Sequence, residues 1–270
     1  MPSSPPSPRS RVFYRARVTV LLLVFLGVAA WAWRDMRSRR ERNAWERSLA
    51  VAVVLVRLGP LDPDSVETFR DRVPALDRRL ADERRRYRPG AARPFVLTFV
   101  GPVDMPQGLP SPAGDGLVDA VKRSVALSRW AASVNEAAGF DPTGYDSRIY
   151  VTARAPKSAG REMVEGESEE GGRVGAVEVE LNASMADFAL FVAAHELFHT
   201  LGATDKYDPA GRAIFPGGFV EPERQPLFPQ PLAEVMARNR PLGPDEERPP
   251  LTLDELAVGA VTAKEIGWIP

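Results

Sequence analysis

The two histidines of the chain, His195 and His199, are four residues apart, and Glu196 follows the first of them. Residues i and i+4 lie on the same face of an α-helix, so a helix through this segment would present both imidazoles side by side. Imidazole is the commonest metal-binding side chain, and a catalytic zinc keeps one position open for water. A carboxylate next to that water can act as a general base. We therefore predict that His195 and His199 bind one Zn²⁺ and that Glu196 is the catalytic base.

The residues around this motif predict how a third ligand reaches the metal. A helix is expected over 185–201, with Ser184 and Asp187 forming a capping box at its start. Gly202 follows directly and suits the left-handed conformation that often ends a helix. The chain can then reverse and bring Asp205 back to the imidazoles. Carboxylate oxygen is a common zinc ligand, so we predict Asp205 as the third one.

The pattern formed by these residues resembles the zinc motif of the metzincins, a family of zinc metalloproteases. In that motif HExxH is followed by a glycine and, three residues later, by a third ligand that is usually histidine. Asp205 at the last position is similar to the snapalysin-like variant, HExxHxxGxxD. The resemblance implies hydrolysis of peptide bonds by a metal-activated water, with protein or peptide as the substrate.

The same resemblance implies two further features of the site. Metzincins carry a methionine turn beneath the zinc, and 233–237 resembles it, with Met236 as its methionine. They also hold the substrate backbone along an exposed sheet edge before the motif helix, and 174–181 alternates like a half-exposed strand. An internal strand without substrate contact is the alternative for that segment. Tyr207 is near enough in sequence to donate a hydrogen bond to the reacting carbonyl oxygen, although a structural role is favoured.

Two other carboxylates are alternative third ligands. Asp208 would take the place of Asp205 if the loop after Gly202 is built differently. Glu234 would complete the site in a gluzincin, in which a glutamate from a downstream helix is the third ligand. Gluzincins normally continue the motif helix without a glycine turn, so Gly202 favours Asp205.

An uncharged and almost wholly apolar stretch at 18–33 lies between Arg17 and Arg34. In a helix it spans about 24 Å, slightly less than the roughly 30 Å of a hydrocarbon core. The arginines can snorkel and the tryptophans near its end suit the interface, so we predict one transmembrane anchor. A cleaved signal peptide, with Ala30 and Ala32 at the cleavage site, is the alternative. Arginines on both sides leave the orientation open, and the resemblance favours a catalytic domain outside the cytoplasm.

The remaining length predicts one further domain. The expected divisions are a disordered basic, proline-rich tail at 1–17, the anchor at 18–33, a juxtamembrane linker at 34–48 and a metalloprotease domain at 49–270. Strands are expected at 49–58, 95–100, 148–153 and 174–181. Helices are expected at 64–87, interrupted or restarted at Pro74, at 115–138, and at 251–268, where Thr252 and Glu255 resemble a capping box. The fold class is therefore α+β, and the resemblance implies a zincin-like domain with a mixed sheet and long helices.

Composition bears on the partners, the cysteine sites and the function classes that are expected. The formal charge of −1 gives no reason to expect nucleic acid as a partner. The chain has no cysteine, which excludes disulfides and zinc–thiolate sites. Arginine clusters at 78–79 and 84–86 alternate with acidic residues and are expected to form solvated helix faces. The function predicted is a membrane-anchored zinc endopeptidase; the alternatives are an inactive zinc-binding scaffold or sensor at the membrane, and a zinc hydrolase acting on another bond.

Overall fold

The structure is a computed structural model that describes residues 8–110, 116–156, 166–168 and 172–270. The chain divides into two compact units, Met1–Glu41 and Arg42–Pro270. All of the predicted site residues belong to the second unit.

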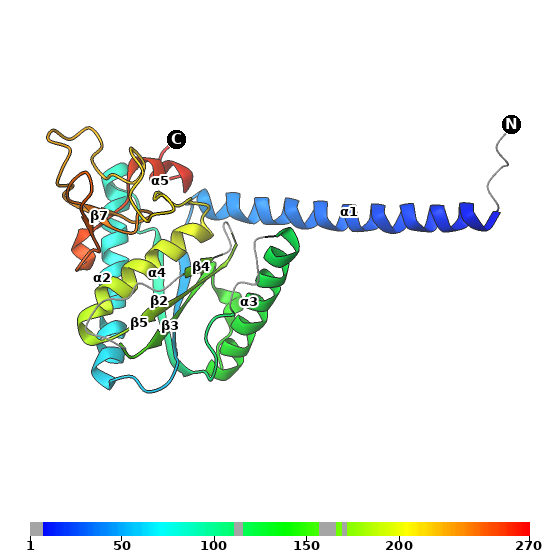
Figure 1. Cartoon of the computed structure of the whole chain (residues 1–270), viewed down its shortest axis with the longest axis horizontal. Helices are drawn as coiled ribbons and strands as arrows, with labels where there is room; N and C mark the ends of the chain where they lie inside the picture. Colours follow the sequence, from blue (N-terminus) through cyan, green and yellow to red (C-terminus); the bar gives the residue numbers. More distant parts are fainter. Residues whose placement is uncertain (1–7, 111–115, 157–165, 169–171) are drawn as a thin grey trace. The chain divides into compact units, whose positions relative to one another are not determined.

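Helix α1 (Pro8–Asn43) runs through the first unit and ends two residues into the second (Figure 1). Its segment Tyr14–Asn43 is long and apolar enough to cross a membrane, a test that a signal sequence near the N-terminus also passes. The predicted divisions after residues 17 and 33 fall inside this helix. Residues 8–17 of the expected tail are helical, since no glycine or proline interrupts them after Pro8, and residues 1–7 lie outside the described part of the chain.

A five-stranded sheet forms the centre of the second unit, with the strand order β2-β1-β3-β5-β4. Four of its strands are parallel, and the edge strand β4 runs antiparallel to β5. Valine-rich β1 is buried on both faces, as expected for a central parallel strand. The strands are β1 (Leu49–Arg57), β2 (Phe95–Asp104), β3 (Ser147–Arg154), β4 (Gly166–Ser168) and β5 (Val174–Glu180). The chain thus has a mixed α/β fold, and the expected mixed sheet with long helices is confirmed.

Helices cover both faces of this sheet (Figure 1). Helices α2 (Pro63–Tyr87) and α4 (Ala186–Thr200) pack on one face, and α3 (Leu117–Ala138) packs on the other. Alternate residues of β1 point into separate cores, as the period of two in a strand requires. Val51, Val53 and Leu55 belong to the core under α2 and α4, whereas Ala52, Val54 and Val56 pack with Trp130 of α3.

Helix α2 differs from its prediction in two ways. It continues through Pro74, so the backbone bond that proline cannot donate is lost without ending the helix. Its charged face is also not solvated throughout, because Glu83 and Arg84 are buried. The Glu83 carboxylate accepts a hydrogen bond from the backbone N–H of Val258, and Arg84 donates to the carbonyl oxygen of Ala92. These two charges therefore fasten α2 to other segments instead of facing water.

The predicted helix at 251–268 is wrong in its extent. The structure has η3 (Leu253–Glu255), β9 (Leu256–Ala257) and α5 (Ala260–Glu265) in this region. Thr252 makes no capping hydrogen bond, and Glu255 instead forms an ion pair with Arg240. Strand β9 pairs with β6 (Ala233–Glu234), so its backbone bonds go to another strand rather than to a helix. The remaining short elements are η1 (Pro142–Gly144), η2 (Ala183–Met185), and the antiparallel pair β7 (Arg240–Pro241) and β8 (Glu247–Arg248).

Strand β5, predicted as a half-exposed edge, lies inside the sheet. It pairs with β3 on one side, where Arg148 is opposite Val174, and with β4 on the other, where Glu167 is opposite Ala176. Most of its residues are buried on both faces. Its alternation of valine and glutamate is therefore not an exposure pattern, since Glu180 is itself buried.

Candidate metal centre

Helix α4 carries the two histidines, and its start is fixed differently from the prediction. The expected capping box does not form: no side chain caps the helix, and the Ser184 hydroxyl donates to Asn182. Asp187 instead forms a bidentate ion pair with Arg72 of α2, with N···O distances of 2.5 and 2.7 Å. This pair ties the start of α4 to its neighbouring helix.

The end of α4 brings three potential metal-ligand atoms together. Gly202 has φ +94°, the left-handed conformation predicted for it, and the chain reverses there. The Nε2 atoms of His195 and His199 are 3.0 Å apart, and Oδ1 of Asp205 lies 3.2 and 3.1 Å from them. Ligand atoms about 2.0–2.2 Å from a tetrahedral zinc are about 3.3–3.6 Å apart, so this triangle is only slightly tighter than zinc requires. The sequence-predicted trio forms one cluster of potential ligands.

Backbone carbonyls fix which nitrogen of each imidazole faces the cluster. Nδ1 of His195 donates to the carbonyl oxygen of Val235, and Nδ1 of His199 donates to that of Ala203, both at 2.9 Å. A carbonyl oxygen can only accept, so in the neutral rings Nε2 keeps its lone pair. Three acceptors then face one another, an arrangement that a proton or a metal cation must hold together. The donor set therefore fits a divalent zinc ion.

The pKa values of the cluster reflect this need for positive charge. Burial lowers the pKa of His199, but its hydrogen bond to Asp205 and the charge of Glu196 outweigh burial and leave it raised. Burial alone would raise the pKa of Asp205, yet the two imidazoles hold it well below its usual range. The Asp205 carboxylate thus favours the charged form of the His199 imidazole.

Glu196 lies beside this cluster on a tightly packed part of α4. Its side chain is buried, and its negative charge contributes to the raised pKa of His199. A Cβ atom placed on Gly175 of β5 would be 3.1 Å from Cβ of Glu196 and 3.2 Å from its backbone oxygen. A side chain at this position would therefore require the helix or the strand to shift by a few tenths of an ångström. Gly175 was not among the residues predicted from the sequence, although a glycine within a valine-rich strand is a signal of close backbone approach.

The segment 233–237 supports both the helix and the third-ligand loop. Val235 accepts the bond from His195, and the backbone N–H of Lys206 donates to the carbonyl oxygen of Met236 at 2.9 Å. A turn closes where Ala237 N donates to Glu234 O, and the Met236 side chain is fully buried. The loop that carries Asp205 is thereby fastened beneath the imidazoles.

The two alternative carboxylates are engaged elsewhere. Asp208 Oδ1 accepts hydrogen bonds from the backbone N–H groups of Ala210 and Arg212, at 2.9 and 3.0 Å. Glu234 is fully buried and accepts from the backbone of Gly259 at 3.1 Å. Neither belongs to the cluster of ligand atoms in the described part of the chain.

Tyr207 lies next to the cluster and contacts Arg238. The Tyr207 ring stacks on His195, with 6.2 Å between centroids and 27° between planes. Burial and the nearby Asp205 carboxylate raise the pKa of Tyr207 to about 12, so its hydroxyl stays protonated at neutral pH. Cζ of Arg238 lies 5.5 Å from the centroid of the same ring. The sequence pointed to Tyr207 as a candidate but gave no signal for Arg238.

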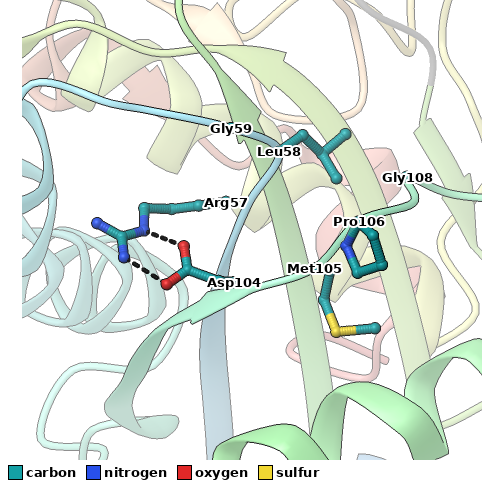
Figure 2. Close-up of a pocket in the computed structure, with 7 residues that line it drawn as sticks. All are labelled: Arg57, Leu58, Gly59, Asp104, Met105, Pro106 and Gly108. Carbon is teal, nitrogen blue, oxygen red and sulfur yellow. Dashed lines mark hydrogen bonds and ion pairs between the residues drawn. The ribbon is translucent and has the colours of Figure 1, made fainter.

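A cavity of about 650 Å³ is lined by residues at the ends of β1 and β2 and just after them (Figure 2). Its wall includes Arg57 and Asp104, at the carboxyl ends of β1 and β2, and these side chains form two hydrogen bonds of 2.7 and 2.6 Å to each other. The candidate cluster is at the other end of the strands, because Gly175 and Ser147 lie at the starts of β5 and β3 and both are close to the second half of α4.

No family model and no curated protein sequence matches the chain. Among solved structures, the chain is similar to the crystal structure of archaemetzincin from Methanopyrus kandleri, with 16% sequence identity and a TM-score of 0.32. The similarity covers 61% of this chain and 78% of that protein. The function is therefore inferred from the residues of the site.

Proposed function

We propose that the protein is a membrane-anchored, zinc-dependent endopeptidase. The observation that carries the proposal is the triangle of His195 Nε2, His199 Nε2 and Asp205 Oδ1, whose imidazoles are both oriented by backbone carbonyls. This arrangement provides three ligands, and a catalytic zinc needs three ligands and an open position. Asp205 is partly exposed, so solvent and substrate can reach the cluster.

The roles of the residues follow from their positions. His195, His199 and Asp205 would hold the zinc ion, which would supply a water of lowered pKa and polarise the carbonyl of the bond to be cleaved. Glu196 would act as the general base for the attacking water and as the proton donor to the leaving amine. Tyr207 is protonated and lies against Asp205 and His195, so we assign it a positioning role.

Two further parts of the proposal concern membrane and substrate. The exposed apolar side chains of α1 support a membrane anchor. A peptide would bind as an extended strand along β4, which occupies the sheet edge that was predicted for β5. Strand β4 pairs with the first half of β5, the half that contains Gly175 and lies under Glu196.

The test combines metal analysis with proteolysis of a denatured protein mixture by the full chain in detergent. We expect about one zinc per chain, cleavage that chelators abolish, and loss of at least about 100-fold of the activity in Glu196→Gln with zinc retained. Glu178→Gln is the matched control, because Glu178 is a partly buried carboxylate paired with Arg154 away from the cluster.

Other outcomes would replace the proposal. Unchanged activity in Glu196→Gln would exclude the mechanism, and a protein that binds no zinc would exclude the site. Stoichiometric zinc without cleavage of any peptide bond would favour a zinc-binding scaffold or a hydrolase of another bond.

A further inference from the structure

Arg238 is a half-buried cation next to the metal-binding cluster. Its guanidinium lies over the Tyr207 ring, which itself stacks on the His195 imidazole. One of its terminal nitrogens is also close to the turn at Gly211, 3.8 Å from where a Cβ atom there would lie. The guanidinium thus lies against the Tyr207 ring and near the turn at Gly211. The Tyr207 ring separates it from His195, a predicted zinc ligand.

Arg238 differs from the arginines around it in having no counterion in the part of the chain that the structure describes. Within those residues its guanidinium forms no hydrogen bond or ion pair. Its contact with the Tyr207 ring is a cation–π interaction. Arg212 pairs with Asp208 and Asp245, and Arg240 pairs with Glu255. Removing a cation partly from water without an anion costs free energy, so this position retains a cost that a bound anion would remove.

The chemistry of a guanidinium selects the anion. Its planar N–H donors match the two oxygens of a carboxylate, and the aromatic contact keeps the group from rotating freely. A peptide in extended conformation advances about 3.3–3.6 Å per residue. The distance from His195 through the Tyr207 ring to Arg238 therefore corresponds to the length of a few substrate residues. A carboxylate near the scissile bond would therefore come within reach of Arg238.

We propose that Arg238 is a specificity-determining residue that binds a carboxylate of the substrate, so that the enzyme prefers peptides with an acidic group within about three residues of the cleaved bond. This inference rests on the proposed peptidase function. The carboxylate can belong to an aspartate or glutamate side chain or to a free C-terminus.

The test uses the full chain in detergent and peptide pairs that differ by glutamate or glutamine at each position flanking the cleaved bond, each with an amidated and a free C-terminus. We expect kcat/KM to favour the carboxylate peptide about tenfold in the wild type, an effect that weakens with salt. Arg238→Gln should reduce this ratio to about one, and Arg238→Glu should reverse it in favour of the glutamine peptide. Arg212→Gln, a nearby arginine with its own carboxylate partners, should leave the ratio unchanged.

A binding measurement separates this inference from the proposed function. Glu196→Gln protein should bind the glutamate peptide about tenfold more tightly than the glutamine peptide, and adding Arg238→Gln should remove the difference while leaving zinc content and melting temperature unchanged. Discrimination that depends on a free C-terminus identifies the terminal carboxylate as the group bound. If wild type cleaves nothing but the binding difference depends on Arg238, the peptidase proposal fails and the carboxylate site stands. If cleavage occurs and neither ratio changes in Arg238→Gln, the inference is overturned.

Discussion

The two ends of the parallel strands both carry charged groups, but they arrange them differently. At the carboxyl ends, beside the cavity, Arg57 pairs with Asp104 and Arg154 pairs with Glu178. At the amino ends, His195, His199 and Asp205 point their acceptor atoms at one another. The ion pairs at the carboxyl ends neutralise their own charges. The three acceptor atoms at the amino ends need a proton or a metal cation between them.

On the proposed function, cavity size alone is a poor guide to the site in this fold. Ligands of open α/β sheets usually bind at the carboxyl ends of the strands, which is where the cavity lies. The three converging acceptor atoms of the candidate cluster lie at the opposite end, because the second half of α4 ends beside the starts of β3 and β5. The candidate site is identified by the direction in which its ligand atoms point, and not by the volume of a cavity.

The largest expected effect comes from removing a metal ligand. His199→Ala should lower zinc affinity by more than about 100-fold, a loss beyond that usually seen for residues that only orient a ligand. In the wild type, zinc at 100 times its dissociation constant should raise the free energy of unfolding by about 2.7 kcal/mol. Thermal melts of both proteins with zinc and with chelator measure this difference. Asp104→Asn should respond to zinc like the wild type. An equal zinc response in His199→Ala would show that the cluster at the amino ends of the strands does not bind zinc.

The second prediction concerns Arg42, which binds the end of helix α4. Arg42 is buried and donates to the carbonyl oxygens of Asp146, Gly172 and Thr200, the last residue of α4. Arg42→Met should lower the free energy of unfolding by about 2–3 kcal/mol, because buried carbonyl groups lose their donors. Denaturant unfolding measures the change, with exposed Arg40→Met as the control. A loss below that of the control would show that the carbonyl groups do not depend on Arg42.

Arg42 also illustrates what a sequence alone does not predict. The spacing of His195 and His199 and the left-handed Gly202 are local features, so the core of the cluster could be predicted from the sequence. Arg42 belongs to an arginine-rich segment predicted as a linker, and its partners are more than a hundred residues away. Burial of a charge by distant carbonyl groups leaves no local pattern.

The same reason explains the errors in the secondary structure. The valines of β1 predicted a buried strand correctly, because a continuous apolar run reports burial directly. The C-terminal helix was predicted too long because Arg79 and β6 bind the backbone of β9, and such tertiary partners override local helix preference. The pairing of β5 with β4 likewise involves a short strand that has no periodic signal.

The third prediction tests whether an already paired carboxylate at the amino ends behaves as a structural group. Asp146 precedes β3 and is bound by Arg47 and the backbone N–H of Ala50. Burial raises its pKa, but these bonds outweigh burial, so its pKa is lower in the folded than in the unfolded protein. A lowered folded pKa means that the stabilisation is complete above about pH 4, the usual range of the unfolded carboxyl, and is lost as pH falls through the folded value.

Asp146→Asn should therefore be less stable than the wild type at neutral pH, by no more than about 1 kcal/mol because Arg47 is mostly exposed. The difference should shrink as pH falls below about 4. Urea unfolding from pH 3 to pH 7 measures it. A difference that stays constant over this range would show that the charge of Asp146 does not contribute.

The smallest expected effect is at the cavity. The Arg57–Asp104 pair has an exposed carboxylate, so Asp104→Asn should change the free energy of unfolding by about 1 kcal/mol or less and leave zinc content and cleavage unchanged. Arg57→Gln should behave in the same way, and the double variant should cost little more than either single one, since each removes the same pair. Urea unfolding and a peptide cleavage assay measure both properties. Loss of cleavage in either variant would place a functional group at the carboxyl ends of the strands, because a pair that only neutralises itself cannot affect chemistry at their amino ends.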